Sequence, residues 1–209
     1  MGLREIMAAN ARRLYLVRHG PTEWNAGHRI QGHTDTQLSD FGRQVVARRQ
    51  LSDEQRAARW FSSPLNRARE TASIMNLHAD VESALIEIAF GEWEGRNKFD
   101  LDIDKALVGR GWDRRPPGGE SRREALHRVL AWLAAAPTHS DLGAVVHGGL
   151  IKTLYAHATG WNLRGNAPDD LTWEAVHCFE LDRYGRIING CYESFAVGDQ
   201  SAWQFPLAA

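Results

Sequence analysis

The chain has 209 residues, 43% of them hydrophobic, and a formal net charge of -1 at pH 7. This length and composition suit one compact domain, so we expect a single domain over residues 1–209. No apolar run approaches the roughly 18 residues of a membrane span. The first dozen residues also lack the apolar stretch of a secretory signal. We therefore expect a frayed leader over residues 1–12 and a cytoplasmic protein with no membrane partner.

The basic residues are almost all arginines, and acidic residues occur in comparable numbers. A mixed, solvated surface explains this pattern better than a nucleic-acid-binding stripe, so no nucleic-acid partner is expected. Cys178 and Cys191 are the only cysteines, and both fall in apparent strands. This placement predicts buried thiols rather than a disulfide or a zinc site.

Apolar runs and capping signals predict four elements in the first part of the chain. The first two are a buried strand at Leu14–Val17 and a helix over about 40–50, which Ser39 caps and whose apolar face carries Phe41, Val45 and Val46. The next two are a strand at Trp60–Ser62 and a helix that Ser63 caps, that begins at Pro64 and that runs through Met75. Short extended segments are expected around Val81 and from Leu85 to Phe90. The polar segment 96–121 is the best candidate for a lid.

The second part of the chain continues the alternation of strands and helices. We expect a helix over about Arg122–Ala135 with Ala125, Leu126, Val129, Leu130 and Leu133 on one face, a strand at Gly143–Val146, a helix through Leu150, Leu154 and His157, and strands at about Trp173–Leu181 and Ile187–Phe195 joined by the hairpin DRYGR. This order predicts an α/β three-layer sandwich, with a mostly parallel central sheet, helices on both faces and a C-terminal antiparallel hairpin.

Two of the predicted strands end in polar residues of similar type. Arg18, His19 and Gly20 follow the first strand, and His147 follows the strand at 143–146. In parallel sheets the carboxyl ends of strands share one edge, where ligands bind. The first turn of a helix that follows a strand faces the same edge, and Arg67 lies in such a turn, whereas Arg69 is expected at the surface. Periodicity separates the two arginines only weakly. For each histidine a hydrogen-bonded structural role is the alternative.

The run LYLVRHGPTEWN, from Leu14 to Asn25, resembles the signature of the histidine phosphatase superfamily, the phosphoglycerate-mutase-like proteins. Further motifs follow in the order of that family, with the text SSPLNRARETA, LIEIAFGEWEGR, PPGGES and VVHGGLIKTL. The resemblance covers about Leu14 to Leu154 and is greatest to small phosphatases such as α-ribazole phosphatase. Pro21 departs from the family, which commonly has a glutamate there.

The resemblance also implies the site residues. It makes His19 the nucleophile that accepts a phosphoryl group and Glu87 the proton donor. The phosphate-binding residues would be Arg18, Asn25, Arg67, His147 and Gly148, with His147 as the second catalytic histidine. Gln31 and Gly32, together with the segment 96–121, are expected to shape the pocket for the leaving group.

These residue types suit a metal-independent phosphomonoester hydrolase that acts on a small phosphorylated metabolite. Arginine forks match phosphate oxygens and neutralise their charge, while burial and the same arginines keep His19 neutral and nucleophilic. Glu87 would protonate the leaving alkoxide and then activate water against the phosphohistidine. No metal-ligand motif is present, so no metal and no cofactor are expected. The alternatives are a phosphoglycerate-type mutase and a catalytically silent phospho-ligand-binding module.

Overall fold

The computed structural model describes residues 12–100, 111–137, 139–163, 171–194 and 196–197. At its centre lies a six-stranded sheet in the order β4-β3-β5-β1-β6-β7. The strands are β1 (Arg12–Arg18), β3 (Arg59–Ser62), β4 (Ala79–Val81), β5 (Leu142–Val146), β6 (Ala175–Leu181) and β7 (Ile187–Ser194). Neighbours from β4 to β1 are parallel, and β6 runs antiparallel to both β1 and β7. The predicted mostly parallel sheet with an antiparallel hairpin is confirmed.

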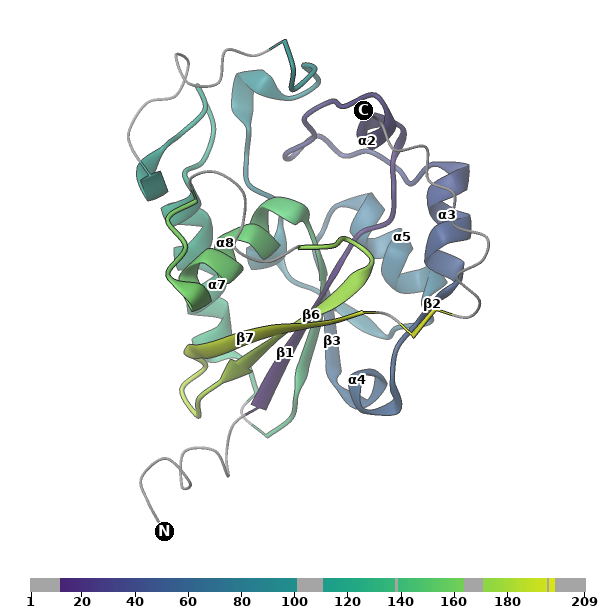
Figure 1. Ribbon diagram of the computed structural model, residues 1–209, viewed down its shortest axis with the longest axis vertical. Coiled ribbons are helices and arrows are strands. Elements are labelled where there is room, and N and C mark those ends of the chain that lie inside the picture. Colours follow the sequence, from purple (N-terminus) through teal and green to yellow (C-terminus); the bar gives the residue numbers. More distant parts are fainter. Residues whose placement is uncertain (1–11, 101–110, 138, 164–170, 195, 198–209) are drawn as a thin grey trace.

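Helices cover both faces of this sheet (Figure 1). One face carries α3 (Asp40–Ala47) and α5 (Asn66–Ile74), and the other carries α7 (Arg122–Ala135) and α8 (Gly148–Thr159). Residues of β1 alternate between the two cores: Leu14 and Leu16 pack on the α7–α8 side, and Tyr15 and Val17 pack on the α3–α5 side. A strand buried on both faces has no polar alternation, which is why the run reads as continuously apolar.

Several short elements complete the described part of the chain. They are α2 (Glu23–Ala26), β2 (Arg49–Gln50), α4 (Asp53–Ala57), β8 (Ala196–Val197) and 3₁₀ turns at Ser83–Leu85, Gly91–Trp93 and Gly111–Asp113. Strand β2 pairs with β8 in a separate two-stranded sheet. The described residues include no helix that is both long and apolar enough to cross a membrane.

Two predicted helices have different ends in the structure. The helix expected over 40–50 stops at Ala47, because Arg49–Gln50 pair with β8 instead. Phe41, expected on its apolar face, is 54% exposed, whereas Val45 and Val46 are buried. The helical periodicity of the sequence extends to residues 49–50, which form a strand in the structure because they pair with β8.

The helix predicted from Pro64 begins at Asn66, with Leu65 as its N-cap. Ser63 does not cap it, because the Ser63 N–H donates to the Val145 carbonyl and its hydroxyl lies 2.7 Å from Nε2 of His147. The expected extended segment from Leu85 starts inside the 3₁₀ turn at Ser83–Leu85. On α8, His157 is exposed rather than part of the apolar face.

The helix predicted at Arg122–Ala135 has the expected bounds and a capping box between Ser121 and Glu124. Arg12, the last residue of the expected leader, belongs to β1, and the rest of that segment lies outside the described residues. The middle of the expected lid, residues 101–110, also lies outside them.

Candidate active site

Strands β1 and β5 bring the two predicted histidines to one edge of the sheet. Arg18 is in register with Val146, and the His19 N–H donates to the Val146 carbonyl over 2.9 Å, so the ladder continues one residue past β1. The centroids of the His19 and His147 rings are 5.2 Å apart. Both residues are buried, with exposures of 5% and 0%. Both side chains therefore border the same small volume.

A backbone contact fixes the tautomer of His19. Its Nδ1 lies 2.7 Å from the Gly20 carbonyl, and because a carbonyl can only accept, Nδ1 carries the proton. Burial, followed by the charges of Arg18 and Arg67, lowers the pKa of His19 well below its usual value. The ring is thus neutral at pH 7, with a lone pair on Nε2. Gly20 is required here, because a Cβ would lie 2.4 Å from the Val46 side chain.

His147 is neutral for similar reasons. Burial and then the charge of Arg67 lower the pKa of His147 well below its usual value. Its Nε2 contacts the Ser63 hydroxyl at 2.7 Å, while its buried Nδ1 has no hydrogen-bond partner among the described residues. The imidazole of His147 is therefore uncharged in this structure.

Arg67 is completely buried, and two backbone carbonyls fix its guanidinium. Its Nη1 donates to the Thr34 carbonyl over 2.9 Å and its Nη2 to the Gly32 carbonyl over 2.7 Å. Its Nε has no partner in the described ranges. Because buried donors almost always have partners, a free N–H here indicates a place for an acceptor that is not part of these residues.

Arg18 also has a buried donor without a partner in the described part of the chain. Its guanidinium lies 4.5 Å from the centre of the Trp173 ring, and its buried Nε also has no partner among the residues described. Burial lowers the pKa of Arg18 to about 10, which leaves it charged at neutral pH. Arg18 and Arg67 thus supply two positive charges beside a pair of neutral histidines.

Glu87 lies near this cluster, since its charge acts on both Arg18 and Arg67. It is 8% exposed, its Oε1 accepts from the Ile88 and Leu150 N–H groups over 2.9 and 3.2 Å, and its Oε2 accepts from the Gly149 N–H over 2.9 Å. The carboxylate therefore sits on the first turn of α8, where N–H groups are unpaired within the helix. A Cβ on Gly149 would lie 2.5 Å from Oε1, so the glycine permits this contact.

The remaining predicted residues lie in the loops above the sheet. The Oδ1 of Asn25 accepts from both the N–H and the hydroxyl of Thr22 at 3.0 Å, which leaves its amide N–H groups for another acceptor. Gln31 is largely buried, and its Oε1 accepts from the Thr36 hydroxyl over 2.6 Å. Gly32 provides a carbonyl to Arg67, so its observed role is to support that arginine.

Sequence reasoning missed Glu94, which organises that loop. Its carboxylate accepts from the His33 N–H and from the N–H and hydroxyl of Thr34. Burial acts to raise the pKa of Glu94, but the bonds from Thr34, His33 and Phe90 outweigh it and hold the pKa below its usual value. Gly32 has φ +56°, and a Cβ there would lie 2.1 Å from Oε1 of Glu94. The signal in the sequence that could have identified Glu94 was its place as the second acid of the motif GEWEG, residues 91–95.

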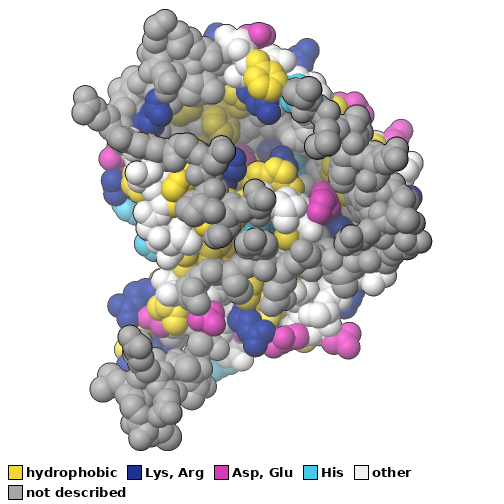
Figure 2. Space-filling model, in the orientation of Figure 1, with side chains coloured by type: hydrophobic (Ala, Val, Ile, Leu, Met, Phe, Trp, Pro, Cys, Tyr) yellow, Lys and Arg dark blue, Asp and Glu magenta, His cyan; other side chains and the backbone are white. Residues whose placement is uncertain are grey.

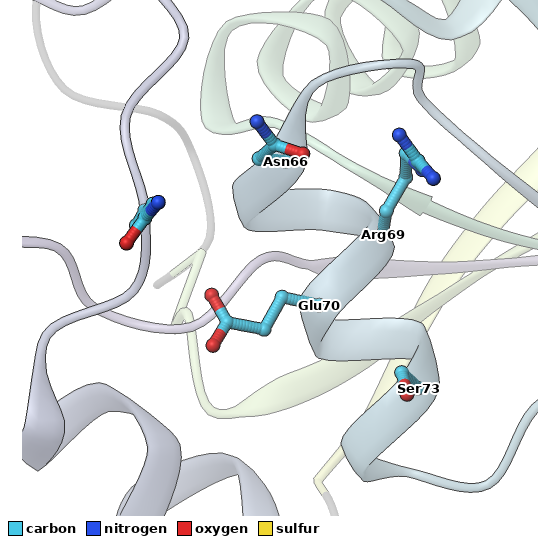
Figure 3. Close-up of a pocket in the computed structure, with 5 residues that line it drawn as sticks. Asn66, Arg69, Glu70 and Ser73 are labelled. Atoms are coloured by element: carbon cyan, nitrogen blue, oxygen red, sulfur yellow. The ribbon is translucent and has the colours of Figure 1, made fainter.

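Arg69 lies away from the histidines, as predicted. It lines a surface hollow with Gln37, Asn66, Glu70 and Ser73 on the outer side of α5 (Figure 3). Figure 2 shows basic side chains in a different hollow, near the top of the face displayed. Within the described ranges, no group of three or more His, Cys, Asp or Glu side chains is arranged to hold a metal ion.

Two neutral imidazoles, two arginines with free buried donors and a carboxylate at one sheet edge define a site for an anionic ester. Comparisons with known proteins identify the family. The sequence profile of the histidine phosphatase superfamily (branch 1) matches residues 14–191, and the chain belongs to that superfamily. The predicted membership and the predicted enzyme class, a phosphatase, are confirmed.

The similar proteins include both phosphatases and mutase-like proteins. Glucosyl-3-phosphoglycerate phosphatase of Mycolicibacterium vanbaalenii is 36% identical over 168 residues, 71% of this chain and 75% of that protein. Phosphoglycerate mutase-like protein 4 of Arabidopsis thaliana is 34% identical over 161 residues, 69% of this chain and 70% of the relative. The structure of mycobacterial glucosyl-3-phosphoglycerate phosphatase with VO3 has a TM-score of 0.65 and 27% identity, covering 90% of this chain and 100% of the other.

Proposed function

We propose that this protein hydrolyses a small phosphomonoester without a metal ion, through a phosphohistidine on His19. The observation that carries the proposal is the state of His19: the Gly20 carbonyl holds its Nδ1 proton, and burial and the charges of Arg18 and Arg67 keep the ring neutral. The Nε–H groups of both arginines are buried and have no partner among the described residues. A dianionic phosphate would supply the missing acceptors. It would also favour protonation of His147, whose low pKa arises from burial and neighbouring positive charge.

The proposed reaction has two steps. In the first, Nε2 of His19 attacks phosphorus, the bond from phosphorus to the ester oxygen breaks, and Glu87 gives its proton to the leaving alkoxide. In the second, Glu87 takes a proton from water, the resulting hydroxide attacks phosphorus, and the N–P bond breaks. Inorganic phosphate leaves, and His19 returns to its neutral form. The arginines stabilise the charge on the transferring oxygens in both steps.

Each phosphate-binding residue has a defined place in this scheme. Arg18 and Arg67 would each donate the unpaired N–H of Nε to the phosphate. One N–H on each Nη of Arg67 already donates to a carbonyl. Asn25 would add a neutral donor through its amide, and Gly148 a backbone N–H at the start of α8. Gln31 would shape the pocket for the leaving group. We propose that the reaction takes place in the cytoplasm, on a small molecule rather than a nucleic acid.

The test is formation of the covalent intermediate. The protein, incubated with p-nitrophenyl phosphate in excess EDTA, should release nitrophenol and, when quenched with alkali, retain a base-stable, acid-labile phosphoryl group. His19→Ala should lose both, while His157→Ala, an exposed histidine on α8, should retain both. A folded wild-type protein that neither turns over nor becomes labelled would refute the phosphatase and leave a silent phospho-ligand-binding module.

The second candidate is a mutase, favoured by the relatives named phosphoglycerate mutase-like. A mutase returns the phosphoryl group to another hydroxyl of the substrate, whereas a phosphatase passes it to water. Incubation with 3-phosphoglycerate separates them: a phosphatase yields inorganic phosphate and glycerate, and a mutase yields the 2-phospho isomer with little free phosphate.

A further inference from the structure

Ser63 lies one residue past the end of β3, and His147 lies one residue past the end of β5. These strands are parallel neighbours, with Ser62 in register with Val145, and the ladder continues because the Ser63 N–H donates to the Val145 carbonyl over 3.0 Å. Both Ser63 and His147 have an exposure of 0%. The 2.7 Å contact between the Ser63 Oγ and Nε2 of His147 is therefore fixed by the register of two strands.

The hydrogen in this contact can belong to either partner, and the surroundings of Ser63 decide which. Its Oγ already accepts from the Leu65 N–H over 3.3 Å. If Nε2 of His147 also donated to it, the Ser63 hydroxyl hydrogen would need another acceptor, and none of the described residues supplies one. A buried donor left without an acceptor costs about 1–3 kcal/mol.

The opposite arrangement leaves fewer groups unpaired. When the Ser63 hydroxyl donates to Nε2, every polar atom of that side chain has a partner, and the ring proton of His147 lies on Nδ1. Nδ1 has no partner among the described residues in either arrangement. One buried group is then unpaired instead of two, which favours the Nδ1–H tautomer.

The tautomer decides how His147 meets an anion. Burial and then the charge of Arg67 lower the pKa of His147, so the ring of the ligand-free protein carries a single proton. An unprotonated Nδ1 would present a lone pair to a phosphate oxygen and repel it. A protonated Nδ1 is a buried donor that needs an acceptor, and a phosphate oxygen can supply that acceptor.

We propose that Ser63 is a positioning residue, whose hydroxyl donates to Nε2 of His147 and so holds the proton on Nδ1, where a phosphate oxygen accepts it. The inference rests on the proposed function for the identity of this anion. At His19 the Gly20 carbonyl, which can only accept, also holds the proton on Nδ1. The two neighbouring imidazoles thus share a tautomer but use opposite nitrogens, Nε2 of His19 as the nucleophile and Nδ1 of His147 as a donor.

Nitrogen NMR of isotope-labelled histidine rings tests this directly, because a protonated and an unprotonated ring nitrogen have well-separated chemical shifts. The ring signals that His147→Gln removes belong to His147. In ligand-free wild-type protein at neutral pH we expect a proton on Nδ1 and none on Nε2. Addition of inorganic phosphate should shift the Nδ1 signal. A proton on Nε2 in the ligand-free protein would overturn the proposal without any variant of Ser63.

Variants then connect the tautomer to Ser63. In Ser63→Ala the ring should also populate the Nε2–H tautomer, and inorganic phosphate should bind about 10-fold more weakly, as for the loss of one charge-assisted hydrogen bond. Ser63→Thr retains a hydroxyl and should restore both. Ser62→Ala is the matched control, because it removes a buried hydroxyl that donates to a backbone carbonyl over 3.0 Å, and it should leave the tautomer unchanged.

The tautomer also separates positioning from a structural role. An unchanged Nδ1–H tautomer in Ser63→Ala would overturn the proposal even if phosphate bound more weakly, since weaker binding without movement of the proton has a structural cause. A change of tautomer in Ser62→Ala equal to that in Ser63→Ala would overturn it as well.

Failure of this proposal and failure of the proposed function give different results. A protein that forms a phosphohistidine but carries the His147 proton on Nε2 would retain the phosphatase and remove the role of Ser63. Conversely, a Nδ1–H tautomer that Ser63→Ala abolishes, in a protein that binds phosphate but hydrolyses no phosphate ester, would retain the role of Ser63 and remove the phosphatase.

Discussion

Gly149→Ala should separate catalysis from stability. A Cβ at this position would lie 2.5 Å from Oε1 and 3.0 Å from Cδ of Glu87, and ordinary contact begins near 3.4 Å, so the carboxylate must retreat by about 0.9 Å. The displaced atoms are the end of a flexible side chain, which makes the change cheap for the fold. Alanine is also favoured over glycine within a helix by about 1 kcal/mol, which offsets the lengthening of the bonds that Glu87 accepts from the Gly149 and Leu150 N–H groups, so the melting temperature should change little.

Activity should respond in the opposite direction. Misplacing a catalytic group by about 1 Å can cost about 100-fold in rate, equivalent to about 2.7 kcal/mol in the barrier. Because Glu87 is the proposed proton donor, the loss should fall on alkyl phosphates, whose alkoxides leave poorly, and should spare p-nitrophenyl phosphate. Steady-state kcat/KM for both substrates, with a thermal melt, measures this. A stable variant with unchanged alkyl phosphatase activity, or with equal losses on both substrates, would refute the reasoning.

Three further expectations concern the same site. Glu87→Gln keeps the shape but lacks the proton, so alkyl phosphate kcat/KM should fall by about 100-fold or more, with a smaller loss for p-nitrophenyl phosphate; equal losses would indicate a positional role. Arg49→Gln removes the 2.7 Å hydrogen bond from Nη1 to the Arg18 carbonyl. We expect kcat/KM for p-nitrophenyl phosphate to fall about 10-fold and the free energy of unfolding in urea to fall by about 1–3 kcal/mol. The exposed control Arg48→Gln should change neither, and matching effects of the two variants would contradict a positioning role for Arg49. The pKa values of His19 and His147 are lower in the folded than in the unfolded protein, so the unfolded chain binds more protons at acidic pH. As the pH falls below about 6.5, the free energy of unfolding should therefore drop by up to about 1.4 kcal/mol per pH unit for each histidine. Equal urea midpoints at pH 7.5 and 5.5 would contradict that.

The fold was predictable because its signals are local. Continuous apolar runs marked β1 and β5, since strands covered on both faces need no polar alternation. Ser121 and Glu124 formed the capping box that set the start of α7. Where the sequence misled, a tertiary contact replaced a local one: Ser63 contacts His147 rather than capping α5, and Arg49 pairs with β8 rather than extending α3.

The site was predictable only in part, for a physical reason. Strand ends and family motifs identified the residues that would touch phosphate. The residues that position them lie far away in sequence, as with Arg49 and the carbonyl of Arg18, or Glu94 and the loop beneath Arg67. Trp173 follows a segment outside the described residues, and no periodicity connects it to Arg18. Such contacts arise from packing, which a motif does not encode.

The way the two arginines are held follows from what they must do. On the surface, Arg43 pairs with Glu70, and such a pair cancels the charge of both partners. Arg67 is instead fixed by two carbonyls, and Arg18 packs against an aromatic ring. A carbonyl or a ring orients a guanidinium without neutralising it, so its full charge remains for an incoming phosphate. Glu94 acts on this region indirectly, because it accepts hydrogen bonds from the loop whose carbonyls bind Arg67. A carboxylate moved inward to contact Arg67 directly would compete with phosphate for the same donors.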